Sequence, residues 1–222
     1  MNQDTWNAVD RYFSDVLVPH DAVLEAAIAD SITAGLPQIH VAPNQGKLLN
    51  LLARSIGARR ILEIGTLAGY STLWLARALP ADGRLVTLEF DAKHAGVARA
   101  NFMRAGLDSR IDLRLGKALD TLPKLAAEGA GPFDFTFIDA DKASIPEYLG
   151  WALKLSRPGS MIVIDNVVRD GAVIDTASTH ASVQGVRRMN EMLASDPRLD
   201  ATAIQTVGSK GYDGFAIALV VG

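Results

Sequence analysis

The chain has 222 residues, of which 49% are hydrophobic and 21% charged, and this balance is typical of a globular α/β protein with a full core. It contains no cysteine, which excludes a disulfide framework and a thiolate metal site. The formal net charge of −3 disfavours nucleic acid as a partner, because phosphate binding needs a clustered basic surface.

The sequence also bears on location. No apolar run reaches membrane-spanning length, so we expect no membrane partner. The polar start Met1-Asn2-Gln3-Asp4 differs from a signal peptide, and a cytoplasmic protein is the default expectation.

Residues 1 to about 60 are predicted to form a helical extension. An apolar stripe recurs at helical spacing and Pro19 ends that segment. We expect Trp6 and Tyr12 to serve packing. The stripe consists of Val9, Tyr12, Phe13, Val16 and Leu17.

Two further helices are predicted in this extension. Asp21 is placed to cap a helix that runs through Ala29. Residues 41–46 are predicted to be a loop, and a strongly apolar helix is expected over 47–56, ended by Gly57.

From residue 61 onward, strands alternate with helices. Near-continuous apolar strands imply burial on both faces and hence a parallel sheet. Two later runs, 201–207 and 215–220, are predicted to form a hairpin joined by residues 208–214, which adds one antiparallel strand. We therefore expect one domain over 1–222, with 61–222 as its α/β core. The first five strands are predicted at 61–64, 85–89, 111–114, 133–138 and 161–165.

A glycine turn follows the first of these strands. The apolar stretch 61–64 ends at Gly65, Gly69 follows four positions later, and a helical apolar pattern begins at Leu73. Such a strand–turn–helix brings bare backbone N–H groups against a ligand at a helix N-terminus. A turn with no ligand is the alternative on this stretch alone.

The residues around the turn indicate the ligand class. A third glycine at dinucleotide spacing is missing, and no Gly-Lys-Ser/Thr phosphate loop occurs. Glu63 places a negative charge beside the turn, which disfavours a diphosphate and favours an ammonium group. A nucleoside with a cationic tail therefore fits better than a nucleotide.

Glu89 ends the second strand, about twenty residues beyond the turn. An acid at this spacing is placed to accept hydrogen bonds from ribose hydroxyls. The alternative is a solvated strand end. Asp91 is predicted to cap a helix that runs to about Ala105 and stops at Gly106.

Two later strands end in acids. Asp139 closes one, and Asp165 with Asn166 closes the next, so all three are expected to project into one crevice. Their oxygens suit a hard cation such as Mg²⁺, although loop caps and a turn residue are the alternative. Lys142, three residues after Asp139, is either a general base or a surface lysine.

In these motifs the chain resembles the cation-dependent O-methyltransferases, the group of catechol and caffeoyl-coenzyme A O-methyltransferases and their bacterial relatives. The resemblance covers residues from about 30 to the end. It rests on Asn44-Gln45-Gly46, Leu62-Glu63-Ile64-Gly65-Thr66, Gly69-Tyr70-Ser71, Phe133-Asp134-Phe135, Asp139-Ala140-Asp141-Lys142 and Asp165-Asn166.

The resemblance implies an S-adenosylmethionine-dependent class I methyltransferase fold, which is Rossmann-like with seven strands and the last antiparallel, in a homodimer. It implies that Asp139, Asp165 and Asn166 ligate Mg²⁺ or a similar ion such as Mn²⁺ or Ca²⁺. Lys142 matches the proposed base, with Asp139 beside it as the second catalytic residue. The implied cofactor shell consists of Val41, Glu63, Gly65, Thr66, Ser71, Glu89, Ala118, Asp139 and Asp141.

The implied reaction is methyl transfer to one oxygen of a vicinal dihydroxy aromatic, a phenolic small molecule. A metal-independent small-molecule methyltransferase is the nearest rival, and a non-catalytic nucleoside-binding protein is a rival of another class. A nicotinamide dehydrogenase fits less well because the glycine pattern differs. The segment 169–186 and the N-terminal residues match no particular acceptor. The histidines, expected to be structural or exposed, are His20, His40, His94 and His180, of which His180 is placed to reach substrate.

Overall fold

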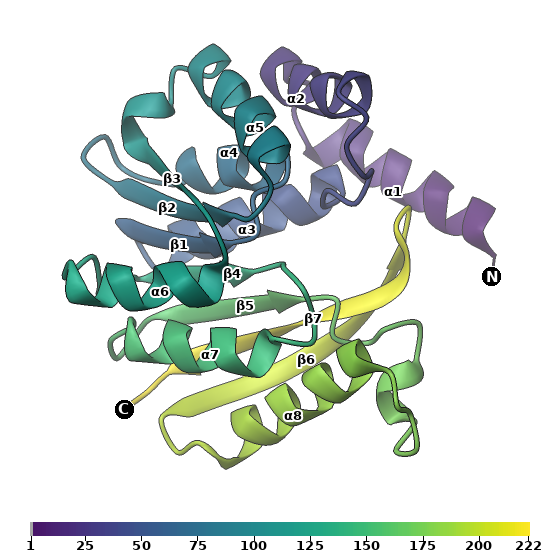
Figure 1. Ribbon diagram of the computed structural model, residues 1–222. Coiled ribbons are helices and arrows are strands. Elements are labelled where there is room, and N and C mark those ends of the chain that lie inside the picture. Colours follow the sequence, from purple (N-terminus) through teal and green to yellow (C-terminus); the bar gives the residue numbers. More distant parts are fainter. Residues whose placement is uncertain (1) are drawn as a thin grey trace.

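A seven-stranded sheet organises the computed structural model, which describes residues 2–222 (Figure 1). Its strands are β1 (Arg60–Ile64), β2 (Arg84–Glu89), β3 (Ile111–Leu115), β4 (Phe135–Ile138), β5 (Met161–Asp165), β6 (Leu199–Gly208) and β7 (Gly211–Val220). They lie in the order β3-β2-β1-β4-β5-β7-β6. Strands β1 to β5 pair in parallel, while β7 runs antiparallel to both β5 and β6, so the predicted mostly parallel sheet with its last strand antiparallel is confirmed.

The C-terminal hairpin is tighter than predicted. The expected loop over residues 208–214 is wrong, because Gly208 already pairs with Gly211 and only Ser209 and Lys210 form the turn. Gly211 has φ +92°, a left-handed conformation that glycine adopts without a steric cost. The glycines in this segment therefore permit a two-residue turn between two long strands.

Eight α-helices cover the sheet within the described residues: α1 (Gln3–Leu17), α2 (Ala22–Thr33), α3 (Pro43–Ser55), α4 (Tyr70–Ala76), α5 (Ala92–Arg104), α6 (Ala118–Ala127), α7 (Ile145–Lys154) and α8 (Ala181–Ser195). Short 3₁₀ turns occur at Asp108–Arg110 and Ala172–Ile174. Across residues 2–222, none of the helices has both the length and the apolar character needed to cross a membrane.

The predicted starts of two helices, α2 and α5, are confirmed, and the predicted start of α3 is wrong. Asp21 accepts hydrogen bonds from the N–H groups of the first turn of α2, and Asp91 does the same for α5. Helix α2 continues past Ala29 to Thr33. Residues 43–46, predicted as loop, are the first turn of α3, because Pro43 needs no N–H donor at a helix start.

Helices cover both faces of the sheet (Figure 1). Apolar side chains are buried between these helices and the sheet on each face. One core cluster joins the sheet to α6, α7 and α8, and the other joins it to α2, α3, α4 and α5. Representative members are Leu122, Leu149 and Val186 in the first cluster, and Leu24, Leu49, Leu73 and Phe102 in the second.

Helix α1 is the exception, because none of its residues is buried. The expectation that Tyr12 serves packing is wrong for this single chain, since 63% of Tyr12 is exposed. The helix contacts the β6–β7 hairpin instead of a sheet face, and Figure 1 shows it beside the tip of that hairpin. The apolar stripe left exposed consists of Val9, Tyr12, Phe13, Val16 and Leu17.

Strand register aligns the carboxyl ends of the central strands. Ile64 of β1 is level with Leu88 of β2 and with Ile138 of β4, and Ile138 is level with Ile164 of β5. The residue after each of these positions therefore belongs to one row across the sheet. That row is Glu89, Gly65, Asp139 and Asp165, which are the four strand-end residues that the sequence singles out.

Asp134, just before β4, fixes where β1 starts. Its carboxylate accepts hydrogen bonds from the backbone N–H groups of Arg59 and Arg60, at 2.8 and 2.9 Å. Burial acts to raise the pKa of Asp134, but these bonds and the Arg157 guanidinium outweigh burial and lower it. The acid in the Phe133-Asp134-Phe135 motif therefore has a structural role at the end of the sheet opposite the row of strand ends.

Candidate functional site

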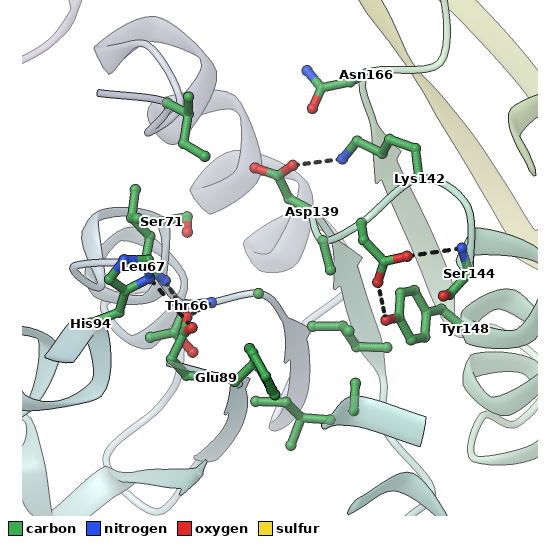
Figure 2. Close-up of a pocket in the computed structure, with 18 of the residues that line it drawn as sticks. Thr66, Leu67, Ser71, Glu89, His94, Asp139, Lys142, Ser144, Tyr148 and Asn166 are labelled. Atoms are coloured by element: carbon green, nitrogen blue, oxygen red, sulfur yellow. Dashed lines mark hydrogen bonds and ion pairs between the residues drawn. The ribbon is translucent and has the colours of Figure 1, made fainter. Parts of the chain in front are cut away.

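A cavity of about 830 Å³ lies at the carboxyl ends of β1, β2 and β4. Figure 2 shows Thr66, Leu67, Ser71 and Glu89 on one side of it and Asp139, Lys142 and Asn166 on another. Two residues expected in the site, Glu63 and Asp165, do not line this cavity. The expected residues that do line it are Val41, Gly65, Thr66, Ser71, Glu89, Ala118, Asp139, Asp141, Lys142 and Asn166.

Gly65 sits where the chain leaves β1 and passes close to the end of β4. It has φ +101°, and a Cβ at this position would lie 2.1 Å from the carbonyl oxygen of Asp139. No side chain fits within that distance. The turn therefore depends on glycine for both its conformation and its approach to β4.

Glu89 holds the glycine turn from beneath. Its Oε2 accepts hydrogen bonds from the N–H of Thr66 at 3.2 Å and of Leu67 at 2.7 Å, and its Oε1 accepts one from Asp91 N at 2.9 Å. Leu67 itself has φ +51°, an uncommon conformation for a residue with a branched side chain. The carboxylate thus stabilises a turn that the backbone alone disfavours.

Glu63 lies below the cavity floor and is fully buried. Its oxygens accept hydrogen bonds from Ser71 Oγ at 2.6 Å, from Thr87 Oγ1 at 2.7 Å and from Thr72. Burial raises the pKa of Glu63 to about 7, and the charge of Asp139 acts in the same direction against the three hydroxyl bonds. Glu63 therefore reaches the cavity through Ser71, whose side chain lines the wall.

Lys142 and Asp139 form an ion pair on the cavity wall, with Nζ 2.8 Å from Oδ1 (Figure 2). The lysine side chain is only 8% exposed, so a surface lysine is excluded. Desolvation strengthens such a contact relative to one in water. The ammonium group and carboxylate are thus held together at the site.

Asp165 and Asn166 follow directly at the end of β5. Asp165 is 6% exposed, and burial together with the charge of Asp139 raises its pKa. Its Oδ1 accepts a hydrogen bond from Asn166 N at 2.9 Å. Asn166 has φ +59°, which asparagine tolerates better than most residues, and this bend turns its side chain onto the cavity wall.

Asp141 anchors the far side of the cavity. Its carboxylate accepts hydrogen bonds from Ser144 N at 3.0 Å and from the Tyr148 hydroxyl, both drawn in Figure 2. Burial acts to raise the pKa of Asp141, but these hydrogen bonds outweigh burial and lower it. Tyr148, which the sequence did not single out, has its own pKa raised by burial and by Asp141.

Three histidines that lie far apart in the sequence line this cavity. They are His40, His94 and His180, whereas His20 is an exposed partner of Glu25. Burial, with the nearby charge of Lys210, lowers the pKa of His40 to about 4, so this imidazole is neutral at pH 7. No periodicity in the sequence signals this grouping, because each histidine comes from a different loop or helix start.

Two apolar side chains on the wall were also missed. Phe90 is 68% exposed and Leu119 is 37% exposed, and both line the cavity. Exposed apolar groups beside polar strand ends suit the flat face of an aromatic ring. The signal available in the sequence was an aromatic residue directly after the acid that ends β2.

The oxygen-bearing side chains at β4 and β5 differ from a purely acidic metal cluster. Within residues 2–222, no three side chains of His, Cys, Asp or Glu gather as metal ligands. A divalent ion would therefore need the amide of Asn166 as well as Asp139 and Asp165. All three supply oxygen, the donor that Mg²⁺ and Ca²⁺ prefer.

Known proteins resemble this chain over nearly its whole length. The model of the O-methyltransferase family matches residues 18–218. A catechol O-methyltransferase of Niastella koreensis is 57% identical over 220 residues, covering 99% of this chain and 100% of the relative. A catechol O-methyltransferase of Mycobacterium tuberculosis is 53% identical over 212 residues, covering 96% and 94%.

Solved structures agree with this similarity. The O-methyltransferase of Bacillus cereus, in complex with SAH, has a TM-score of 0.97 at 57% identity and covers 99% of this chain and 100% of its own. The O-methyltransferase TomG of Streptomyces achromogenes, in complex with SAM, has a TM-score of 0.97 at 55% identity, with 100% of both chains covered.

Replacing Gly65 with alanine tests the close approach of β1 and β4. We expect Gly65→Ala to lower the free energy of unfolding by at least about 2 kcal/mol, because the new Cβ clashes with the Asp139 carbonyl at a positive φ. Gly96→Ala on α5 is the control, since open space surrounds it and alanine favours a helix. Urea unfolding measures both. Equal stability of Gly65→Ala and the wild type would contradict the described turn.

Proposed function

The chain belongs to the O-methyltransferase family and is an S-adenosylmethionine-dependent O-methyltransferase, and from this premise we propose that it transfers the methyl group to a vicinal dihydroxy aromatic with the help of a divalent ion. The observation that carries the proposal is the row of strand ends, in which oxygen ligands on β4 and β5 lie beside the glycine turn of β1. The catechol O-methyltransferase names of the two relatives support the acceptor class.

The proposed cofactor cradle follows the cavity wall. The methionine part lies by Gly65, Thr66 and Ser71, with Glu63 acting through its hydrogen bond to Ser71. Ala118 borders the adenine. Val41, Asp139 and Asp141 complete the shell, and Phe90 offers the adenine an exposed aromatic face.

Glu89 is proposed to bind the ribose as well as the turn. A carboxylate has about four lone-pair positions, and three backbone N–H groups use three of them here. The fourth position, on Oε1, is left for a ribose hydroxyl beside the His94 imidazole, whose Nδ1 lies 3.5 Å from Oε1. Because Glu89 lines the cavity, that position is accessible to a bound nucleoside.

The residues at the proposed metal site fit a divalent ion. Asp165 makes no ion pair with any residue of the described chain, and the charge of Asp139 is balanced only by Lys142. Burial and the charge of Asp139 disfavour the ionised form of Asp165, and a cation between the two carboxylates would offset both effects. We propose Asp139, Asp165 and Asn166 as ligands for Mg²⁺, with Mn²⁺ or Ca²⁺ as substitutes.

When bound, S-adenosylmethionine supplies the methyl group and the divalent ion supplies positive charge that favours the ionised acceptor hydroxyl. A phenolic hydroxyl has a pKa near 10, so lowering it by about three units corresponds to roughly 4 kcal/mol. Most of the rate enhancement then comes from charge and from holding the reactants in line.

Lys142 is the proposed base for the hydroxyl proton. A lysine accepts a proton only in its neutral form, and the Nζ of Lys142 lies 2.8 Å from Asp139 Oδ1. Its side chain is only 8% exposed and lines the cavity, so the amine lies where a bound acceptor would reach it.

Chelation tests the metal requirement. We expect a chelator to abolish methyl transfer to catechol and added Mg²⁺ to restore it. Asp165→Ala should lower turnover and leave cofactor affinity unchanged. The loss should exceed roughly 10–100-fold, which is the usual effect of removing a residue that only hydrogen-bonds to a metal ligand. Asp200→Ala, an exposed acid on β6, is the control. Full activity in excess chelator would refute the metal role and favour a metal-independent methyltransferase.

A second prediction separates the two functions of Glu89. Calorimetry should show that Glu89→Gln weakens binding of S-adenosylhomocysteine about tenfold, which is about 1.4 kcal/mol. An analogue without ribose hydroxyls should bind the variant and the wild type alike. The same loss for both ligands would mean that Glu89 only supports the turn.

We also propose that the protein is a homodimer through the exposed face of α1. The stripe residues of α1 remain 44–63% exposed. A patch of this kind on one surface is typical of an interface. A second copy of the chain would bury it.

Sedimentation velocity tests the dimer. Phe13→Glu should convert the dimer to monomer, because a charge at the apolar face would be buried unpaired. Ile174→Glu is the control, since Ile174 is 83% exposed and lies in a 3₁₀ turn away from α1. A wild-type protein that sediments as a monomer at micromolar concentration would rule out this interface.

A further inference from the structure

Gln45 contacts a proposed metal ligand from outside the ligand set. Its Nε2 donates a hydrogen bond to Asp165 Oδ2 at 2.8 Å, across 120 residues of sequence. The other oxygen of Asp165 accepts the N–H of Asn166. The carboxylate therefore has one donor on each oxygen and cannot rotate without breaking a hydrogen bond.

The position of Gln45 is itself tightly determined. Its backbone N donates to Asn44 Oδ1 at 2.9 Å, and Asn44 Nδ2 donates to Asp10 Oδ1 at 2.9 Å. Asp10 Oδ2 accepts the N–H of Ser209 at 2.7 Å, in the turn of the β6–β7 hairpin. A continuous set of hydrogen bonds thus joins α1, the hairpin turn and the start of α3 to the end of β5.

Packing holds the same turn of α3 from the other side. A Cβ on Gly46 would lie 2.4 Å from Cδ1 of Trp74 on α4, so the indole of Trp74 packs directly against the α3 backbone at Gly46. Gln45 and Asp165 both line a second cavity of about 270 Å³, between the start of α3 and the hairpin. The hydrogen bond between Gln45 and Asp165 therefore lies at this second cavity.

We propose that Gln45 is a positioning residue that orients the Asp165 carboxylate for the divalent ion. This inference rests on the metal site proposed above. Second-shell hydrogen bonds fix the direction of a ligand's remaining lone pairs, and their loss typically costs about 10–100-fold in metal affinity. Gln45 makes no contact with the larger cavity, so it acts on the ion through Asp165 and leaves the cofactor alone.

The test is Mn²⁺ binding, followed by electron paramagnetic resonance on the full-length protein. Gln45→Met keeps the side-chain length and removes the donor, and we expect about 10–100-fold weaker Mn²⁺ binding with S-adenosylhomocysteine affinity unchanged. Gln45→Ala leaves space for a water to replace the amide, so its loss should be smaller. Gln205→Met is the matched control, because Gln205 lies on β6 and bonds Tyr212.

The outcomes separate this role from the proposed function. Wild-type Mn²⁺ affinity in both Gln45 variants would overturn the positioning role and leave the metal site standing. A wild-type protein that binds no Mn²⁺ would overturn both. Parallel loss of Mn²⁺ and S-adenosylhomocysteine binding, or a large drop in melting temperature, would show a general structural role and would also overturn the proposal.

Discussion

The close approach of β1 to β4 is the constraint on which the site depends. These two strands are neighbours in the sheet although β2 and β3 separate them in sequence. The strand order therefore changes direction between β1 and β4, with β2 and β3 on one side of β1 and the later strands on the other. In open parallel sheets the crevice at such a point is where ligands bind. Here the backbone of Gly65 lies so near the Asp139 carbonyl that the glycine turn and the end of β4 pack directly against each other beside the cavity.

Buried acids support this arrangement from below. Glu63 gathers three hydroxyl groups under the cavity floor, and Glu89 gathers three backbone N–H groups beneath the turn. Each of these hydroxyl and N–H groups would destabilise the fold if it were buried without a hydrogen-bond acceptor. The same residues that a sequence motif suggests for ligand contact therefore also build the surface that the ligand meets. Their mutants need a readout that separates the two roles.

Much of the fold could be predicted because its signals are local. Apolar runs, glycine ends and the Asp21 and Asp91 caps each act within a few residues, and the strands and helices formed largely where these signals placed them. The start of α3 was missed because Pro43 looks like a loop residue yet is compatible with a first helical turn. The turn at Ser209 and Lys210 was missed because glycines also occur in tight hairpins.

The residues of the site could be predicted from the sequence mainly where they directly follow a buried strand. Glu89, Asp139 and Asp165 follow buried strands, so the topology alone aligns them. Gln45 and His40 reach the site through tertiary packing, which no spacing in the sequence encodes. The exposed stripe of α1 marks the opposite limit, since periodicity correctly indicates an apolar face but not the partner that covers it.

The central claim is that two neighbouring strand ends hold one divalent ion beside the glycine turn. Anomalous diffraction from crystals grown with Mn²⁺ and S-adenosylhomocysteine tests it most directly. We expect one strong anomalous peak in contact with oxygens of Asp139, Asp165 and Asn166. Crystals with the nucleoside bound and no peak at these three side chains would contradict it.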